Sequence, residues 1–311
     1  MILIEPNVML ITEKDPAKKI ELAGRTCYKS EDKITSDSAE KFMKMLISRN
    51  HLAMTEHAIF CFEYNTDNVE DAYYVYKVLK NISKFAYTTV TQVKKQNYRV
   101  LYSANMRVLI ENGIIYDNEY SLYNFNFSKC GVTLDLVDFE EDVKDKTDEE
   151  IKNHRFTTMR FITDRGVTHE IVRHRLCSFA QESTRYVKYN NDNMQFIKPT
   201  GYEDWEPVVK GRFLNACTEA EANYCNLMNN GLTAQQARAV LPNAIKTEIV
   251  VTANDEEWHH IFDLRCDKAA HPDMRKIANM AKLIYWDTYP EVQGVVEFVP
   301  ESIWIDTKTC T

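Results

Sequence analysis

Residues 166–186 of this chain read GVTHEIVRHRLCSFAQESTRY, and this stretch decides how the fold and the function are interpreted. Residues 156–163 before it are expected to form a strand, and Asp164-Arg-Gly166 is expected to form a turn. A helix is then expected to begin near Thr168 and to carry residues 169–174. The stretch also places three arginines among apolar neighbours.

Those arginines favour an anionic partner. A guanidinium keeps its charge at physiological pH, so a partly buried one needs a negative group beside it. The two glutamates of the stretch can neutralise only part of this charge, whereas Ser183 and Thr184 add hydroxyl donors of the kind that a phosphate accepts. The pattern therefore predicts a phosphate-bearing ligand, with internal salt bridges and an exposed basic helix end as the alternative. The arginines are Arg173, Arg175 and Arg185.

Hydrophobic periodicity around this stretch predicts further strands and helices. The expected strands are residues 2–11, 57–64 and 86–101, the last as one or two strands. The expected helices are residues 16–28, 36–49, 67–85, 103–113, 205–229, 233–241, 254–263 and 272–289. In the short helix, Ser103 is expected to be the N-cap and Gly113 to end the helix.

The order of these elements predicts one domain, residues 1–311, of the α/β (α+β) class. Residues 66–150 are expected to be an insertion into this domain. The acidic run within it, residues 138–150, is expected to be a solvated excursion at the surface. No internal repeat or low-complexity linker is visible in the sequence.

Composition excludes several classes of protein. A formal net charge of −8 disfavours non-specific nucleic-acid binding, which needs a broad basic face. The eight cysteines are scattered and form no C-x-x-C pair, so reduced and mostly buried thiols are expected. No apolar run approaches the roughly 20 residues that span a bilayer, and the first residues lack a basic leader followed by an apolar core. These features predict a cytoplasmic protein that does not span a membrane.

Five segments resemble the flavin-dependent thymidylate synthases. R-H-R followed by seven residues and a serine is a motif of that family, and here it is Arg173-His-Arg175 followed by 176–182 and Ser183. Four other segments resemble family elements in the same order along the chain. They are Gly24-Arg-Thr-Cys-Tyr-Lys-Ser30, His51-Leu-Ala-Met-Thr-Glu-His57, Gln236-Ala-Arg-Ala-Val-Leu-Pro242, and Thr252-Ala-Asn254 with Phe262-Asp-Leu-Arg265.

The resemblance implies a fold and an activity. The fold is a central, mostly antiparallel sheet with flanking helices, of the thymidylate-synthase-complementing type. The activity is the reductive methylation of dUMP to dTMP, with 5,10-methylenetetrahydrofolate as carbon donor and FAD reduced by NADPH. No protein thiol attacks the base in that family, and the active sites of its homotetramer are shared between subunits. Ser183 is expected to bind the ligand, because no activating base is readable beside it.

The resemblance also assigns site residues. Arg265 is expected to be the catalytic residue, because its charge favours the ionised pyrimidine. The residues expected at FAD are His51, Ala53, Glu56, Arg173, His174, Arg175, Gln181, Asn254, Asp255, Glu256 and His260, the first three from a neighbouring subunit. The residues expected at dUMP are Glu170, Arg173, Gln181, Glu182, Ser183, Thr184, Arg185, Arg238 and Arg265. No metal ligand is expected.

Three residues depart from the family pattern. Ala53 stands where Ser or Thr is usual, so a hydroxyl contact to the flavin is absent. Glu170 stands where Gln is common, which places a carboxylate near dUMP. His260 occupies a position often held by Asn.

Three other interpretations compete with this resemblance. His169 and His174 come close to the zinc motif H-E-x-x-H, but a five-residue step leaves two helical side chains about 140° apart, too far to share one ion. A nucleic-acid module would use R-H-R as a phosphate clamp and the tyrosine clusters at 73–76 and 116–123 for stacking. A different flavoprotein, such as a reductase, gives no reason for Arg238 and Arg265 to lie beside the flavin.

Overall fold

The computed structural model describes residues 1–115, 124–141, 143–190 and 193–292, and its strands form two antiparallel sheets and one parallel pair. The central sheet has the order β2-β7-β10-β8, the second sheet has the order β4-β5-β3-β6, and β1 pairs with β9. The strands are β1 Ile2–Ile4, β2 Asn7–Leu10, β3 Ile59–Thr66, β4 Tyr87–Lys94, β5 Asn97–Asn105, β6 Asp135–Val137, β7 Phe156–Asp164, β8 Ser178–Gln181, β9 Gln195–Ile197 and β10 Lys246–Asn254.

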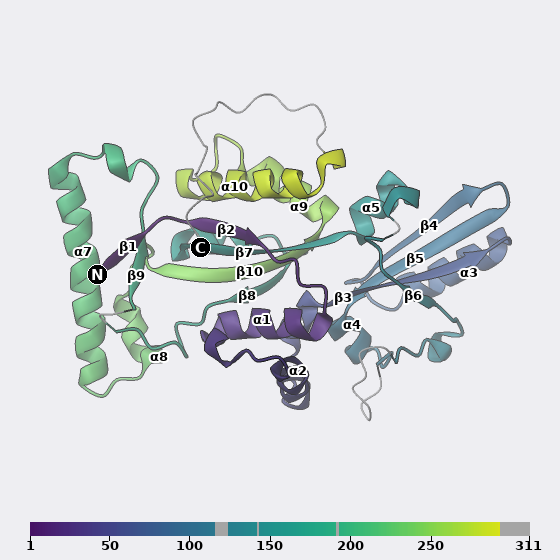
Figure 1. Cartoon of the computed structure of the whole chain (residues 1–311), viewed down its shortest axis with the longest axis horizontal. Coiled ribbons are helices and arrows are strands. Elements are labelled where there is room, and N and C mark those ends of the chain that lie inside the picture. Colours follow the sequence, from purple (N-terminus) through teal and green to yellow (C-terminus); the bar gives the residue numbers. More distant parts are fainter. Residues whose placement is uncertain (116–123, 142, 191–192, 293–311) are drawn as a thin grey trace.

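Helices cover both faces of the central sheet. Figure 1 shows α9 and α10 on one face and α1 on the other, with the second sheet and α3 at one end of the molecule. The helices are α1 Pro16–Tyr28, α2 Ser38–Ser48, α3 Val69–Lys80, α4 Met106–Glu111, α5 Asp148–His154, α6 Arg165–Ile171, α7 Pro207–Asn229, α8 Ala234–Ala237, α9 Asp255–Arg265 and α10 Pro272–Thr288. The expectation of antiparallel sheet with flanking helices is confirmed.

The central strand β10 is one of the elements that the sequence analysis missed, along with β6, α5, β8 and β9. All nine of its residues are buried, and it pairs with β7 on one side and β8 on the other. Its Ile249 and Val251 pack under α9 and α10, whereas Val250 packs against Ala23 of α1. On the α1 face the strand also carries Lys246 and Glu248, and two charges in one short segment concealed its strand pattern.

The junction between β7 and α6 corrects the turn expected at residues 164–166. Strand β7 continues to Asp164, and α6 begins at once with Arg165. The carboxylate of Asp164 accepts a hydrogen bond from the backbone N–H of Val167 at 2.8 Å, so Asp164 is the N-cap. A Cβ on Gly166 would lie only 3.0 Å from that carboxylate, which explains the glycine. The helix ends at Ile171, so His174 lies on the loop beyond it.

Two expectations in the 66–150 region were also wrong. Asn105, and not Ser103, caps α4, because Ser103 lies within β5 and its hydroxyl contacts the His154 ring at 2.9 Å. The acidic run is not wholly a solvated excursion, since Phe139 within it is buried and Glu150 is fully buried in a bidentate pair with Arg99.

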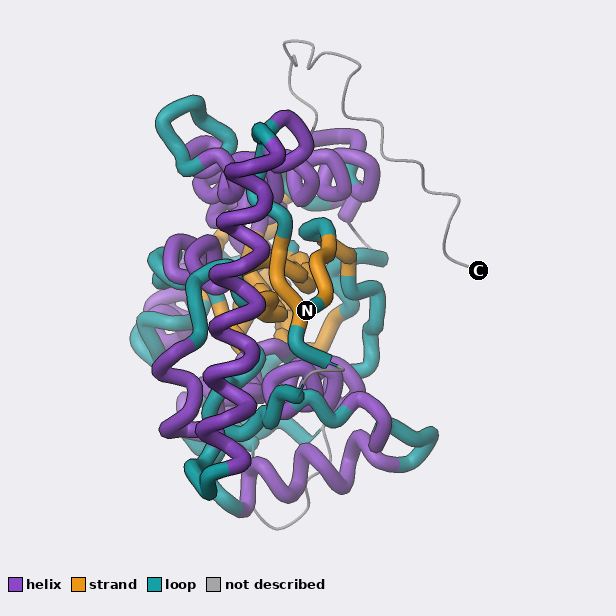
Figure 2. Tube along the Cα trace, turned by 90° about the vertical axis from the view of Figure 1, so that its left-hand side faces the viewer, coloured by secondary structure: helices purple, strands orange, loops and turns teal. Residues whose placement is uncertain are grey.

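The strand expected at residues 2–11 is divided into two. Pro6 separates β1, which pairs with β9, from β2, which joins the central sheet beside β7. Figure 2 views the molecule from this end, with α7 running alongside the strands. A proline has no N–H to donate to a ladder, so the chain changes partners there.

Two further features bear on the composition argument. No helix in the described ranges combines the length and the apolar character needed to cross a membrane. The seven cysteines that the structure describes are free thiols, three of them buried and four partly exposed. Cys310 and the tyrosine cluster at 116–123 lie outside the described residues.

Candidate active site

Arg265 is the last residue of α9, and its guanidinium has three protein acceptors. Its Nε donates to Nε2 of His174 at 3.0 Å, its Nη1 donates to Oε2 of Glu170 at 3.1 Å, and its Nη2 donates to the backbone carbonyl of Glu170 at 3.1 Å. The structure therefore brings the expected catalytic residue into contact with two other expected site residues. Both partners come from α6 and the loop that follows it.

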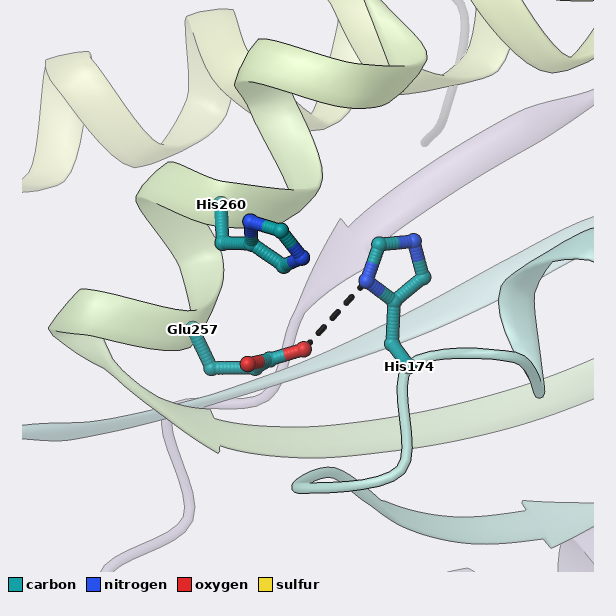
Figure 3. A group of neighbouring side chains, drawn as sticks. All are labelled: His174, Glu257 and His260. Atoms are coloured by element: carbon teal, nitrogen blue, oxygen red, sulfur yellow. Dashed lines mark hydrogen bonds and ion pairs between the residues drawn. The ribbon is translucent and has the colours of Figure 1, made fainter.

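His174 also contacts α9 through Glu257. Its Nδ1 lies 3.3 Å from Oε1 of Glu257, and its ring lies edge-on to the ring of His260 with the centroids 5.6 Å apart (Figure 3). These three side chains have metal-ligand chemistry, with their ligand atoms within 4.8 Å of one another. Arg265 donates to Nε2, however, so Nδ1 carries the ring proton and donates it to Glu257. A metal ion would need the lone pair at that nitrogen, and we assign the group to hydrogen bonding.

The serine of the motif lies in a second group of site residues, after β8. The N–H of Ser183 donates to the carbonyl of Cys27 at 2.9 Å, and its hydroxyl accepts from the N–H of Arg185 at 3.3 Å. Beside it, Arg238 donates to the hydroxyl of Thr184 at 3.2 Å, and Arg185 donates to the side chain of Gln235 at 3.1 Å. In the described part of the chain no base contacts the Ser183 hydroxyl, which agrees with a binding role.

Arg165 belongs to this second group and was not identified from the sequence. Its Nη1 donates to the backbone carbonyl of Glu182 at 3.4 Å. Burial lowers the pKa of Arg165, and the nearby charge of Arg238 lowers it further, although Tyr189 and Glu182 act in the opposite direction. Two guanidiniums therefore lie close together. The expected turn at 164–166 concealed Arg165, because it ended the strand before the residue that begins α6.

The arginines around the motif differ from most others in the molecule in lacking carboxylate partners. Within the described ranges, none of them has a carboxylate oxygen within 4.0 Å. A concentration of unneutralised positive charge on one part of an acidic chain is the arrangement of an anion-binding site. These residues are Arg165, Arg173, Arg175, Arg185 and Arg238.

Glu182 and Gln181 make internal contacts. Glu182 is buried, and its carboxylate accepts from the hydroxyl of Tyr189 at 2.7 Å and from Lys246 at 3.0 Å. The side-chain amide of Gln181 donates to the hydroxyl of Thr168 at 2.7 Å. These contacts hold the start of the motif loop against β10 and α6.

Two neighbouring cavities lie beside the loop of the motif. One, of about 210 Å³, is lined by Glu56, Arg107 and Arg175 together with the aromatic rings of Phe85 and Tyr87. The second, of about 420 Å³, is lined by His51, Ala53, Tyr28 and Tyr186, and shares Arg107 with the first. Glu56 accepts from Arg107 at 2.7 Å. The segment 51–57 and the R-H-R loop therefore reach one cavity within a single subunit.

Asn254 and Asp255, at the start of α9, make hydrogen bonds within the protein. Asn254 is its N-cap and accepts from the N–H of Glu257 at 3.1 Å. Asp255, expected at the flavin, is fully buried and accepts from Nε of Arg155 at 3.0 Å and from the hydroxyl of Tyr285. Glu256 is exposed. Burial raises the pKa of Asp255, although Arg155 and Tyr285 oppose this shift.

The chain resembles known proteins at the level of family, sequence and structure. The model of the family described as thymidylate synthase complementing protein matches residues 9–70 and 85–291. A flavin-dependent thymidylate synthase of Geobacter sulfurreducens is 37% identical over 123 residues, a match that covers 39% of this chain. A flavin-dependent thymidylate synthase of Pyrococcus furiosus is 34% identical over 123 residues, a match that covers 37% of this chain. The chain spans about half the length of these curated relatives, 52% and 47% respectively.

A solved structure is similar over most of its length. It is a UMP/dUMP methylase, PolB, from Streptomyces cacaoi bound with 5-Br dUMP, with 16% identity and a TM-score of 0.40 over 92% of this chain and 93% of that chain.

Proposed function

We propose that this chain, which belongs to the thymidylate synthase complementing protein family, is a flavin-dependent thymidylate synthase that methylates dUMP to dTMP. The observation that carries the proposal is the set of arginines without carboxylate partners around the R-H-R motif. An anionic nucleotide and an anionic cofactor are ligands that such a site fits.

The dUMP phosphate is assigned to the group around Ser183. Arg165, Arg185 and Arg238 supply guanidiniums there, and the hydroxyls of Ser183 and Thr184 lie among them. Arginine binds phosphate bidentately, so two or three such groups fix both the position and the orientation of the nucleotide. The buried carboxylate of Glu182 accepts from Tyr189 and Lys246, and these contacts fix the start of this loop.

The pyrimidine is assigned to Arg265. This guanidinium has N–H groups left over after its three protein contacts, and those can donate to a ring oxygen. Its charge favours the ionised ring, in which C5 is a better nucleophile. A preorganised donor aimed at developing charge contributes a few kcal/mol, on the order of 3, to catalysis.

FAD fits the residues around the two cavities. Arg175 lines the first cavity and offers a guanidinium for the FAD phosphates, with Arg173 two residues earlier on the same loop, and Tyr28, Phe85 and Tyr186 offer exposed rings for stacking. FAD, when bound, would supply the redox chemistry of the reductive methylation. The finer assignments of NADPH as reductant, 5,10-methylenetetrahydrofolate as carbon donor, a homotetramer with shared active sites and a cytoplasmic location belong to the same proposal.

An absorbance scan tests the proposal most directly. We expect the purified protein, alone or after addition of FAD, to show a flavin band that dUMP perturbs. With 5,10-methylenetetrahydrofolate and NADPH it should then form dTMP. A protein that shows no flavin band and instead binds single-stranded RNA with steep salt dependence would contradict the proposal and favour a nucleic-acid module.

A further inference from the structure

Glu170 makes two contacts with the guanidinium of Arg265. Its carboxylate accepts from Nη1 at 3.1 Å and its backbone carbonyl accepts from Nη2 at 3.1 Å. The two side chains are 32% and 20% exposed, so the pair lies at the edge of the site and not in the core. The plane of the guanidinium is therefore set by α6 on one edge and by His174 on the other.

The charge of Arg265 is offset by Glu170 alone among the ion pairs of the described residues. His174 accepts from Arg265 through Nε2 and donates to Glu257 through Nδ1, which requires a neutral imidazole. The four residues thus form a continuous chain of contacts in the order Glu257, His174, Arg265, Glu170. Only the last member brings a negative charge into direct contact with the guanidinium.

We propose that Glu170 is the positioning residue of Arg265, and that its carboxylate limits how strongly Arg265 favours an ionised pyrimidine. This inference rests on the proposed function, because it assumes that the base lies at Arg265. An ionised pyrimidine beside Arg265 would also be repelled by the carboxylate of Glu170, because two negative groups that share one guanidinium disfavour each other. A neutral ring carries no such penalty.

Two substitutions separate position from charge. Glu170→Gln keeps a side-chain oxygen that accepts from Nη1 and keeps the backbone contact, but it removes the negative charge. Glu170→Ala removes both the charge and the side-chain acceptor. Asp263→Asn is the matched control, because it removes one negative charge from an exposed position on the same helix as Arg265.

The probe is 5-bromo-dUMP, whose bromine makes the ring N–H more acidic than that of dUMP. Its affinity for each variant, reconstituted with FAD, is measured by calorimetry from pH 6 to pH 9. A site that prefers the ionised ring binds more tightly as the pH rises through the pKa of the ligand. Comparison between variants cancels the titration of other groups near the pair. Those groups are Asp164, Arg173, His174, Glu257, His260, His271 and Asp273.

We expect the Glu170→Gln protein to gain about tenfold more affinity between pH 6 and pH 9 than the wild type and the Asp263→Asn control, which should agree. We expect kcat for dTMP formation to be about tenfold or more lower in Glu170→Ala than in Glu170→Gln, because only the Ala variant loses the side-chain acceptor that orients Arg265.

Equal pH dependence in wild type and Glu170→Gln would overturn the role of the charge. Equal kcat in Glu170→Gln and Glu170→Ala would overturn the positioning role. In both cases the wild type remains active, and the proposed function stands. A wild-type protein that neither binds 5-bromo-dUMP nor forms dTMP overturns the proposed function and this inference together.

Discussion

Arg155 and Arg238 use the same side chain for opposite purposes. Arg155 has no exposed side-chain surface, and its Nε donates to both carboxylate oxygens of Asp255, at 3.0 and 2.9 Å. Arg238 contacts the hydroxyl of Thr184, and no carboxylate in the described ranges pairs with it. Where the chain supplies a counter-charge, an arginine is part of the fold. Where it supplies none, as at Arg238 beside the motif loop, the guanidinium keeps donors that a ligand can use.

The largest expected effect is the loss of stability when Arg155, the arginine with a carboxylate partner, is replaced. Arg155→Met should lower the free energy of unfolding by about 3–5 kcal/mol, because it leaves the buried carboxylate of Asp255 without its charged partner. Urea unfolding followed by circular dichroism measures this change. Arg238→Met is the matched control and should stay within about 0.5 kcal/mol of wild type. Similar losses in the two variants would remove the distinction between paired and unpaired arginines.

Arg265 lies between the two classes, with one carboxylate contact and free donors. Arg265→Ala should slow dTMP formation about 100- to 1000-fold, because it removes the group that stabilises charge on the ring. Oxidation of the reduced flavin by oxygen should stay close to the wild-type rate, since it does not involve the pyrimidine. Stopped-flow absorbance follows both reactions. A variant that forms dTMP as fast as the wild type would exclude Arg265 from catalysis.

The unpaired arginines around Thr184 should affect binding of the nucleotide. Arg185→Ala and Arg238→Ala should each raise the KM for dUMP about tenfold or more, because each removes hydrogen bonds to a charged phosphate. Arg212→Ala, an exposed charge change on α7, is the control and should leave KM unchanged. An unchanged dUMP affinity in both site variants would contradict the proposal that Arg185 and Arg238 bind the dUMP phosphate.

Local structure was predicted well where the signals that begin and end an element lie within or next to that element. The bounds of α1 agree with the expected helix 16–28, because Asp15 caps it and Pro16 opens it. Strand β10 was missed because Lys246 and Glu248 find their partners far away in the sequence, at Glu182, Lys29 and Arg160. Periodicity measures apolar burial, and it does not register charges that are buried in pairs.

The site shows the same limit. The family resemblance assigned site roles to Arg265, His174 and Glu170, and the structure shows that Arg265 contacts both of the others. Arg165 could not be identified, because its position depends on β7 continuing directly into α6. The buried pairing of Asp255 with Arg155, a hundred residues earlier, was equally invisible to a local pattern.

The smallest expected effect tests the paired charges of β10. Burial raises the pKa of Glu248, but the charges and hydrogen bonds of Lys246, Lys29 and Arg160 outweigh it and lower that pKa from 4.5 to about 2. A carboxylate whose pKa is lowered on folding stabilises the protein above its unfolded pKa, and this contribution is lost as the pH falls from about 4.5 towards 2. Glu248→Gln should therefore reduce the difference in unfolding free energy between pH 7 and pH 3 by on the order of 1 kcal/mol. Glu219→Gln, an exposed change on α7, should leave that difference unaltered, and urea titrations at the two pH values measure both. If the unfolding free energy falls as much between pH 7 and pH 3 in Glu248→Gln as in wild type, the charge of Glu248 does not contribute to the pH dependence. The contacts of Lys246 and Arg160 would then stabilise β10 without that charge.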